Sequence, residues 1–459
     1  MTTRKPRFIA VFDVGKTNAK LAIVDTNTMS EGAVLKTANT VIHTGAYPHF
    51  DMEALWDFFL SSIAELNAVY PVDAISLTIH AASGALIKED GTLALPVLDY
   101  EYQGPDELRQ DYDAIRPPFG DTFSPRLPKG LNFGAQLYWQ SRQYPKEFAQ
   151  TRYILSLPQY WAHRMTGVAA SEATSLGCHT DLWRPATGEF SSLVDKLGWR
   201  HLFPPVRSAF DVLGPLLPEL CARTGVRLGT PVHSGIHDSN ASFLPHLLSR
   251  KPPFSVISTG TWVIILSSGG DLQHLDPMRD TLANTDAFGH PVASGRFMGG
   301  REYEVLTKGI DDLDPRALDE VMDKGIILLP AIESGSGPFL GRLSKWVPQV
   351  PEPRLIPAAA SLYLAMMTAT SLTLTGSKGD LIVEGPFAKN QIFLDMLTVA
   401  TGQSVFTNTS SSTGTSIGAA LLALGSNFSF SLQSKPAPAP EPSLSARLAV
   451  WCDRWRKSL

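Results

Sequence analysis

Two segments of this chain share one pattern, in which an apolar strand, a glycine-containing turn and a second apolar strand follow one another. The first is FIAVFDVGKTNAKLAIV (Phe8–Val24), and the second is FSVISTGTWVIIL (Phe254–Leu266). They turn at Gly15 and Gly260. A single glycine turn between two strands is common. Two such hairpins, each at the start of a long segment, predict a duplicated fold with a cleft between its halves.

The segments that follow each hairpin alternate between strand and helix patterns. Met52–Tyr70 has apolar residues at helical spacing, and Ala74–Ile79 is a short apolar run typical of a buried strand. In the second half, a long helix from Ala358 is followed by a strand at Asp380–Glu384 and a helix at Gln391–Ala400. This order predicts an α/β fold in each half.

The composition describes a folded enzyme and excludes one class of partner. Of the 459 residues, 44% are hydrophobic and 18% are charged, and this length predicts two large domains. The formal net charge is -5, and the chain has no dense run of Lys and Arg. Because nucleic-acid binding needs a basic surface, we expect no nucleic-acid partner.

One apolar stretch, Ala358–Thr375, approaches the length of a membrane-spanning helix. Ser and Thr interrupt it, and Pro and Gly flank it like helix-end signals, so we interpret it as a buried core helix and expect no membrane association. The N-terminal segment has no apolar signal-peptide core. The widely spaced Cys178, Cys221 and Cys452 predict free thiols in a reducing cytosol, and therefore a cytoplasmic protein.

The first glycine turn has the residues of a phosphate-binding loop. Glycine lets the backbone approach an anion, and Gly15 is followed by Lys16, Thr17 and Asn18, which add a cation and polar side chains. Asp13 ends the preceding strand. A carboxylate beside polyphosphate is unfavourable unless Mg²⁺ lies between them, so Asp13 implies a magnesium ion bound through water. The alternative is that Asp13 only caps its own turn.

Asp238, in the sequence SGIHDSNASF, is the candidate general base. It follows a strand-like segment, Pro231–Ile236, and precedes the second hairpin. An aspartate at this place could simply cap a helix starting near Ser239. We favour the base, because transfer of a phosphoryl group to a hydroxyl group is aided by a side chain that accepts the hydroxyl proton.

Two histidines near these segments, His237 and His80, are candidates for substrate contact. His233 and His237 are four residues apart, as in a helical metal site, but Gly235 lies between them and the segment reads as strand and turn. We therefore interpret His237 as a substrate contact beside Asp238. His80 ends the strand AISLTIH, where it either contacts the substrate or is an ordinary strand-end histidine.

Taken together and in order, the motifs of this chain resemble those of the FGGY carbohydrate kinases, within the actin/Hsp70/hexokinase superfamily. The resemblance covers about residues 8–425. The motifs that carry it are DVGKTNAK (Asp13–Lys20), IHAASG (Ile79–Gly84), HDSNAS (His237–Ser242), STGTW (Ser258–Trp262), FMGGREY (Phe297–Tyr303), VEGPFAKN (Val383–Asn390) and TSIGAALLA (Thr415–Ala423).

The resemblance implies two ribonuclease-H-like α/β domains with a catalytic cleft between them. We expect an N-terminal domain over 1–245 on the sugar and phosphate side, a C-terminal domain over 246–427 on the nucleotide side, and a Pro/Ala linker with a C-terminal helix over 428–459. The resemblance also implies ATP and Mg²⁺, with transfer of the γ-phosphoryl group to a hydroxyl group of a sugar or polyol.

Site residues follow by matching positions in the motifs. Asp238 is implied as the base and Asp13 as the residue facing Mg²⁺. The residues implied to bind ATP and its phosphates are Asp13, Gly15, Lys16, Thr17, Asn18, Lys20, Thr259, Gly260, Thr261, Gly385 and Asn390. Those implied to bind the substrate are His80, Ala81, Asp99, Tyr100, His237 and Asp238.

Two departures from the family pattern concern the nucleotide. Lys16 stands where the family usually has Thr or Ser, and Pro386 replaces the second glycine of the adenosine motif. The His237–Asp238 pair is more similar to the rhamnulose and fuculose kinase branch than to glycerol kinases, which suggests a 6-deoxyketohexulose or a pentulose. A xylulose, ribulose or polyol kinase, a catalytically weak sugar- or nucleotide-binding regulatory protein, and a chaperone- or filament-type ATPase stay open as alternatives.

Other segments predict local structure. Asp99–Leu131, rich in Pro, Gly and Asp, reads as a long irregular loop, and Asn132–Thr166 as helical with a stop at Gly167. Ser434–Pro442 reads as an extended linker before a short helix, Ala446–Lys457, which we expect to dock on the body. The sequence leaves open whether the chain forms a homodimer.

Overall fold

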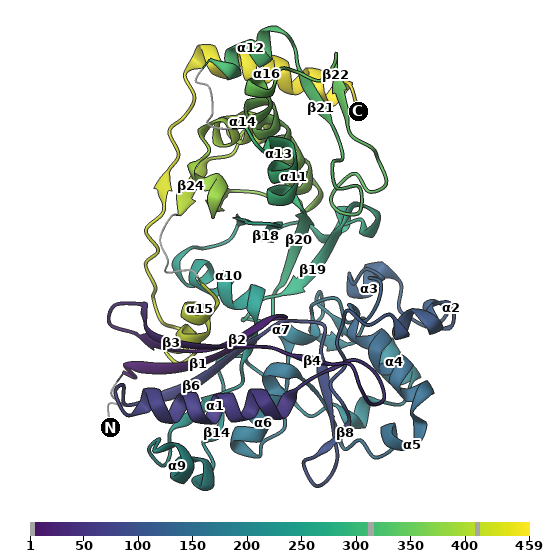
Figure 1. The fold of residues 1–459 in the computed structure, drawn as a ribbon, viewed down its shortest axis with the longest axis vertical. Coiled ribbons are helices and arrows are strands. Elements are labelled where there is room, and N and C mark those ends of the chain that lie inside the picture. The colour runs from purple at the N-terminus through teal and green to yellow at the C-terminus, as the bar shows by residue number, and fades with distance from the viewer. Residues whose placement is uncertain (1–4, 311–315, 409–413) are drawn as a thin grey trace. The chain divides into compact units, whose positions relative to one another are not determined.

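The computed structural model describes residues 5–310, 316–408 and 414–459, and the chain divides into two compact units (Figure 1). Unit 1 comprises Met1–Ser249, Ala283–Pro291 and Ser411–Leu432, and unit 2 comprises Arg250–Leu282, Val292–Ser410 and Gln433–Leu459. The boundary drawn from the sequence after residue 245 falls inside helix α10, and the chain enters unit 1 again near its C-terminus. Each unit contains a mixed sheet with helices packed on it.

The predicted first hairpin forms the middle of the sheet in unit 1. Strand β1 (Phe8–Val14) pairs antiparallel with β2 (Asn18–Asp25) and parallel with β6 (Ala74–Ile79), which has the bounds predicted for it. The strand order is β14-β15-β6-β1-β2-β3, and β16 (Ile236–His237) also pairs with β6. Strand β3 (Ser30–Ala38) was not among the predicted elements.

Side chains of β1 alternate between two apolar layers, as the period of a strand requires. Ala10 and Phe12 pack on one face with α1 (Met52–Asn67) and α6 (Leu157–Thr166). Ile9 and Val11 pack on the other face with α10 (Asp238–Ser249) and α15 (Thr415–Leu422). Because both faces are covered, the strands are almost continuously apolar, which is why the sequence pattern identified them.

The segment 99–131 is more ordered than the predicted irregular loop. It contains η1 (Gly104–Leu108), α2 (Arg109–Asp113) and α3 (Phe119–Thr122). A buried ion pair holds it: Arg116 donates from Nε and Nη2 to the two carboxylate oxygens of Asp181, at 2.9 and 2.8 Å. The Tyr112 hydroxyl donates to the same carboxylate at 3.0 Å. This long-range contact has no local sequence signal, so the prediction was wrong here.

The predicted helical segment 132–166 also needs a correction. The segment contains helices α4 (Phe133–Gln143), α5 (Pro145–Phe148) and α6. Strand β9 (Tyr153–Ser156) lies between α5 and α6 and pairs with β7 (Gly84–Ile87). Helix α6 ends at Gly167 in a left-handed conformation, which confirms the predicted stop.

Unit 2 contains the second predicted hairpin, β17 (Phe254–Thr259) and β18 (Val263–Ser268). Strand β23 (Asp380–Glu384) pairs parallel with β17, and β20 (Pro291–Phe297) lies beside β18. The apolar stretch 358–375 lies in helix α13 (Ile356–Leu374). It belongs to the one described helix long and apolar enough to span a membrane, but 89% of its apolar window is buried, as the predicted core helix requires.

The remaining elements connect and cover these layers. In unit 1 they are β4 (Val41–Ile42), β5 (His49–Phe50), β8 (Leu93–Leu95), β10 (Ser171–Glu172), α7 (Ala173–Leu176), β11 (Trp183–Arg184), β12 (Glu189–Phe190), α8 (Ser192–Lys196), η2 (Arg200–Leu202), β13 (Val206–Arg207), β14 (Val212–Pro215), α9 (Pro218–Thr224) and β15 (Pro231–His233). In unit 2 they are η3 (Leu272–His274), η4 (Pro277–Arg279), α11 (Gly299–Thr307), α12 (Ala317–Asp323), β21 (Ile327–Leu329), β22 (Lys345–Val347), η5 (Pro353–Leu355), η6 (Pro386–Lys389), α14 (Gln391–Thr401), β24 (Val405–Asn408), β25 (Lys435–Pro436) and α16 (Pro442–Lys457). Strand β19 (Thr281–Thr285) begins in unit 2 and ends in unit 1.

The C-terminal helix α16 docks on unit 2, as predicted. Leu448, Trp451 and Trp455 are buried in the main apolar core of this unit. The indole N–H groups of Trp451 and Trp455 donate to the carbonyl oxygens of Ile326 and Leu328, at 2.9 and 2.8 Å. These contacts fasten the tail against β21 and its preceding turn.

We predict that Trp455→Ala lowers the stability of unit 2, because it leaves a cavity and an unpaired carbonyl group. The expected loss in the free energy of unfolding is about 3–5 kcal/mol. Val450→Ala is the control on the same helix, since Val450 is 71% exposed, and it should change stability by less than about 0.5 kcal/mol. Urea unfolding followed by far-ultraviolet circular dichroism, which reports on the backbone, measures both. Equal midpoints for Trp455→Ala and the parent would contradict this packing.

Candidate active site

The carboxyl ends of three neighbouring strands in unit 1 bring the predicted residues together. In the sheet register Asp13 of β1 lies opposite Thr78 of β6, and His237 of β16 lies opposite Ile79. His80 follows directly after β6, and Asp238 directly after β16. The carboxyl edge of such a sheet is the common place for a ligand site in α/β folds.

Asp238 is ionised and paired. Its Oδ1 lies 3.0 Å from Nε2 of His237 and accepts a 2.6 Å hydrogen bond from the N–H of Ser239. Burial alone would raise the pKa of Asp238, but the charge and hydrogen bond of His237 outweigh it and hold that pKa below its usual value. Burial opposes protonation of His237, yet the charges of Cys178 and Asp238 raise its pKa well above the usual value. The pair is therefore an imidazolium–carboxylate ion pair.

Three further groups act on His237. Its backbone N–H donates to Oγ1 of Thr174 at 3.0 Å, and the side-chain amide of Asn240 lies 3.2 Å from Nδ1. The amide atom placed there is Nδ2, and a protonated His237 ring requires the amide turned so that its oxygen accepts from the Nδ1–H group. The side chain of Cys178 is also buried, and its charge raises the pKa of His237. The charges of His179 and His237 overcome the effect of burial and lower the pKa of Cys178 to about 5.

Behind Thr174 lies a buried carboxyl group, Glu172. Thr174 donates from its hydroxyl to Oε2 at 2.6 Å and from its N–H to Oε1 at 2.8 Å. Burial raises the pKa of Glu172 to about 7, and the hydrogen bonds with Thr174 only partly oppose this. A chain of contacts thus runs from Glu172 through Thr174 and His237 to Asp238.

His80 carries an acceptor atom with no protein partner. Its Nδ1 lies 2.9 Å from the carbonyl oxygen of Ala81, so Nδ1 bears the proton and Nε2 has the lone pair. Nε2 is buried, and no described residue hydrogen-bonds it. Burial lowers the pKa of His80, which keeps the ring neutral. The ring packs against Phe50 and Tyr100, with centroids 5.4 and 5.2 Å away. A hydroxyl donor of a ligand would complete this site.

Lys16 lies with the residues predicted for the sugar. It hydrogen-bonds Asp99 and lies 3.6 Å from Glu101, and its ammonium group sits over the rings of Phe50 and Tyr100. Burial raises the pKa of Tyr100 above its usual range, so this hydroxyl group stays protonated. Among the predicted phosphate residues of this loop, Thr17 and Asn18 are exposed, and Gly15 is held in the turn by a 2.9 Å hydrogen bond to the Asn18 carbonyl oxygen.

The surroundings of Asp13 suit a hydrated Mg²⁺ ion. Its Oδ2 accepts a hydrogen bond from Thr415 and lies 3.5 Å from Nζ of Lys20. Burial raises the pKa of Asp13, and the charge of Asp238 adds to this. A cation beside the carboxylate would therefore stabilise its charged form. Among the described residues no group of three His, Cys, Asp or Glu side chains could hold a metal directly. One carboxylate is enough for a magnesium ion that keeps its waters and binds phosphate oxygens.

In unit 2 the predicted nucleotide residues gather at the ends of β17 and β23. Thr259 hydrogen-bonds the carbonyl oxygen of Glu384 and accepts from the N–H of Phe387 at 3.1 Å. Gly385 has φ +81°, and a Cβ there would overlap the Thr259 carbonyl group, so glycine is required. Asn390 caps α14 and donates to Ser361 at 2.8 Å. Gly260 and Thr261 remain exposed in the turn.

The sequence did not single out several residues that complete the site. Glu172, Thr174 and Cys178 belong to no quoted motif, and Cys178 was noted only as a free thiol. Thr415 lies in the quoted motif TSIGAALLA, and this was the one available signal for it. All three cysteines are free, as predicted, and all three are buried.

Comparison with known proteins gives two matching family models. They are the FGGY family of carbohydrate kinases, N-terminal domain, over residues 119–244, and carbohydrate kinase FGGY, C-terminal domain, over residues 251–431. A solved carbohydrate kinase from Novosphingobium aromaticivorans is 33% identical, with a TM-score of 0.91, and the alignment covers 99% of this chain and 98% of that one.

More distant relatives share parts of the sequence or the fold. L-fuculokinase of Salmonella typhi is 24% identical, and the alignment spans 58% of this chain and 58% of the fuculokinase, a little over half the length of that relative. The ligand-bound xylulose kinase from Lactobacillus acidophilus is 16% identical, with a TM-score of 0.79 over 98% of this chain and 97% of that one, and so shows the shared fold alone.

We predict that ionising Glu172 destabilises the protein. The folded chain holds this proton to about pH 7 instead of the ordinary 4.5, so the contribution of Glu172 to stability is fully present below pH 4.5 and is lost as the pH rises to about 7. The full cost is up to about 3 kcal/mol. In Glu172→Gln this loss disappears, so the difference in unfolding temperature between variant and parent should grow from pH 5 to pH 8. A difference that stays constant with pH would contradict the assignment.

Proposed function

The chain belongs to the FGGY family of carbohydrate kinases, and we propose that it transfers the γ-phosphoryl group of ATP to a hydroxyl group of a ketose, with Asp238 as general base. The observation that carries the proposal is the ionised Asp238 beside His80, whose Nε2 lacks a partner. One group accepts a proton and the other accepts a hydrogen bond, which together suit a polyhydroxylated substrate.

In the proposed step, the substrate hydroxyl oxygen bonds to the γ-phosphorus while the bond from that phosphorus to the β–γ bridging oxygen breaks. The hydroxyl proton passes to the carboxylate of Asp238, and ADP leaves. Because the pKa of Asp238 is lowered, the group is ready as an acceptor at neutral pH but is a weak base. Its main contribution is therefore alignment of the hydroxyl group, with proton transfer late in the step.

His237 keeps that carboxylate oriented through their ion pair. His237 is itself held by the hydrogen bond from its backbone N–H to Thr174 and by the contact of its ring with Asn240. Lys16, Asp99 and Tyr100 form the polar and aromatic wall that we assign to the sugar. Mg²⁺ would neutralise phosphate charge near Asp13 and Lys20. Thr17 and Asn18 in unit 1, and Gly260, Thr261 and Gly385 in unit 2, are the proposed contacts with ATP.

The proposed acceptor is a 6-deoxyketohexulose or a pentulose. The names of the relatives support this class, since they include L-fuculokinase and L-xylulose/3-keto-L-gulonate kinase of Escherichia coli. The buried, neutral His80 supports it too, because its unpartnered Nε2 can accept a hydrogen bond from a sugar hydroxyl group. Free buried thiols and ATP as the donor support activity in the cytoplasm.

A coupled assay of ADP release with L-fuculose, L-rhamnulose, both xyluloses, both ribuloses and glycerol tests the substrate class. We expect at least one ketose to stimulate ADP release well above the rate with glycerol. If glycerol is preferred, or if turnover proceeds equally without any sugar, the ketose kinase assignment is wrong.

Asp238→Asn tests the base. We expect kcat to fall by about 10²–10⁴-fold because the acceptor for the proton is lost, while the Kd for ATP changes less than about twofold. Asp57→Asn is the matched control, because Asp57 is exposed on α1 and its carboxylate pairs with the exposed Arg223 at 3.4 Å. Equilibrium dialysis with ATP and the coupled assay provide both readouts. Near-normal turnover in Asp238→Asn would remove this residue from the reaction.

A further inference from the structure

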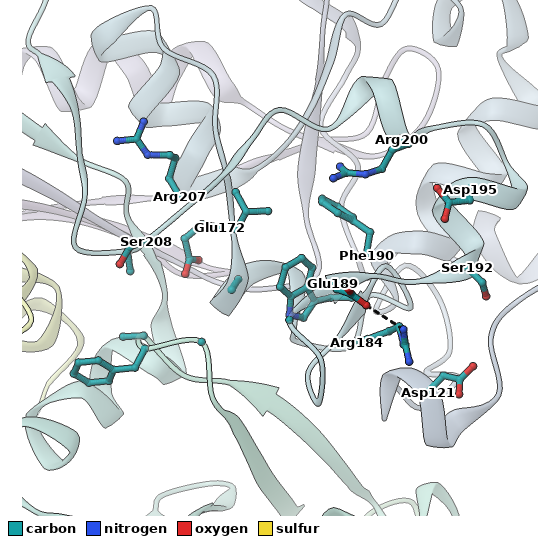
Figure 2. Close-up of a pocket in the computed structure, with 18 residues that line it drawn as sticks. Asp121, Glu172, Arg184, Glu189, Phe190, Ser192, Asp195, Arg200, Arg207 and Ser208 are labelled. Carbon is teal, nitrogen blue, oxygen red and sulfur yellow. Dashed lines mark hydrogen bonds and ion pairs between the residues drawn. The ribbon is translucent and has the colours of Figure 1, made fainter.

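Unit 1 contains a polar pocket that none of the predicted site residues line. It has a volume of about 790 Å³ (Figure 2). Its walls come from the hairpin β11–β12, the start of α8, and the segments 206–209 and 287–289. In the view of Figure 2, Glu172 lies between Ser208 and Phe190, with Arg207 above Ser208 and Glu172, and Arg200 above Phe190.

Three guanidinium groups line this pocket. Arg184 is 3.3 Å from Glu189 and Arg207 is 2.7 Å from Asp211, and these arginine side chains are 40% and 45% exposed. Arg200 stacks on the ring of Phe190, 4.3 Å from its centroid. In the part of the chain that the structure describes, no carboxylate lies within ion-pair distance of Arg200. Exposed guanidinium groups that are weakly paired or unpaired can bind phosphate oxygens through two parallel hydrogen bonds.

The rest of the lining suits hydroxyl groups and a carbon ring. Ser192, Ser208, Asp121 and Asp195 are exposed, so they can exchange hydrogen bonds with a polyhydroxylated ligand. Phe190 offers an aromatic face to the C–H groups of a sugar. A simple anion would use the arginines alone and leave the carboxylates facing it, so the mixed lining favours a ligand that has both a phosphate group and several hydroxyl groups.

Glu172 connects this pocket with Asp238. Its carboxyl group is buried at the pocket wall, 2.6 Å from the Thr174 hydroxyl group. Thr174 accepts the backbone N–H of His237 at 3.0 Å, and His237 pairs with Asp238. A ligand that contacts Glu172 therefore acts on a residue three contacts away from the proposed base.

We propose that this pocket is a second ligand site, which binds a sugar phosphate through Arg200 and its neighbouring arginines and transmits its occupancy through Glu172 and Thr174. The binding part of this proposal does not depend on the proposed activity. The transmission part rests on the proposed function, because it requires turnover to measure.

Isothermal titration of the full chain with D-fructose 1-phosphate, with D-fructose and inorganic phosphate as partial probes, tests the binding part. We expect the sugar phosphate to bind the parent, and to bind at least about tenfold more weakly to Arg200→Ala because the guanidinium contact is lost. Arg184→Ala should show a smaller loss, since this arginine is already paired. Arg152→Ala is the control, because Arg152 is a similarly exposed arginine of unit 1 outside the pocket, paired with Glu89 at 3.2 Å. Both partial probes should bind more weakly than the sugar phosphate.

Three outcomes would overturn the site: equal affinity in Arg200→Ala and Arg152→Ala, inorganic phosphate binding as tightly as the sugar phosphate, or no heat of binding in the parent. For transmission, D-fructose 1-phosphate should change the KM or kcat of the parent and of Arg152→Ala, but not of Arg200→Ala. An equal response in Arg200→Ala would place the effect at the catalytic site and overturn the transmission. Loss of turnover in all three proteins would instead count against the proposed function, and the titration would still decide the binding part.

Discussion

The ion pair between His237 and Asp238 is the interaction on which the site depends. The carboxylate of Asp238 is partly buried at the start of α10, and burial disfavours its charged form. His237 supplies the opposite charge, and it is itself held by the parallel pairing of β16 with β6 and by Thr174 and Asn240. The charge of Cys178 raises the pKa of His237. The sheet register therefore fixes the place of the base relative to His80 and Asp13.

This arrangement explains why buried polar groups gather behind one short strand. Glu172 and Cys178 do not need to reach a substrate to matter, because each acts on the orientation or charge of His237. Ionisation of Glu172 lowers the stability of the fold, and buried groups of this kind are common near functional sites. Unit 2 differs, because Thr259 and Asn390 have structural roles that would require these residues whether or not a nucleotide binds.

The sequence predicted the elements that have strong local patterns. Strands β1, β6 and β23 and helix α13 are nearly continuous apolar runs, and their buried positions follow from that pattern. It failed where long-range contacts decide the structure. The Arg116–Asp181 ion pair orders a segment that reads as loop, and β9 forms because β7 provides a pairing edge.

The same distinction applies to the site. Asp13, His80 and Asp238 stood at strand ends, so their proximity followed once the strands were ordered. The contact of Lys16 with Asp99 and the chain from Glu172 to His237 join residues far apart in sequence, and no local spacing predicts them. Motif order identified the family, whereas the details of charge around Asp238 needed the three-dimensional contacts.

The ionisation state of His237 tests the central claim most directly. A ¹⁵N NMR titration of the imidazole rings, with the His237 signal assigned by His237→Gln, reports which nitrogens carry protons at each pH. The account predicts that His237 stays protonated on both nitrogens well above pH 7 in the parent, and that its pKa falls in Asp238→Asn. Titration near the ordinary value of about 6.5 in both proteins would show that the ion pair does not exist.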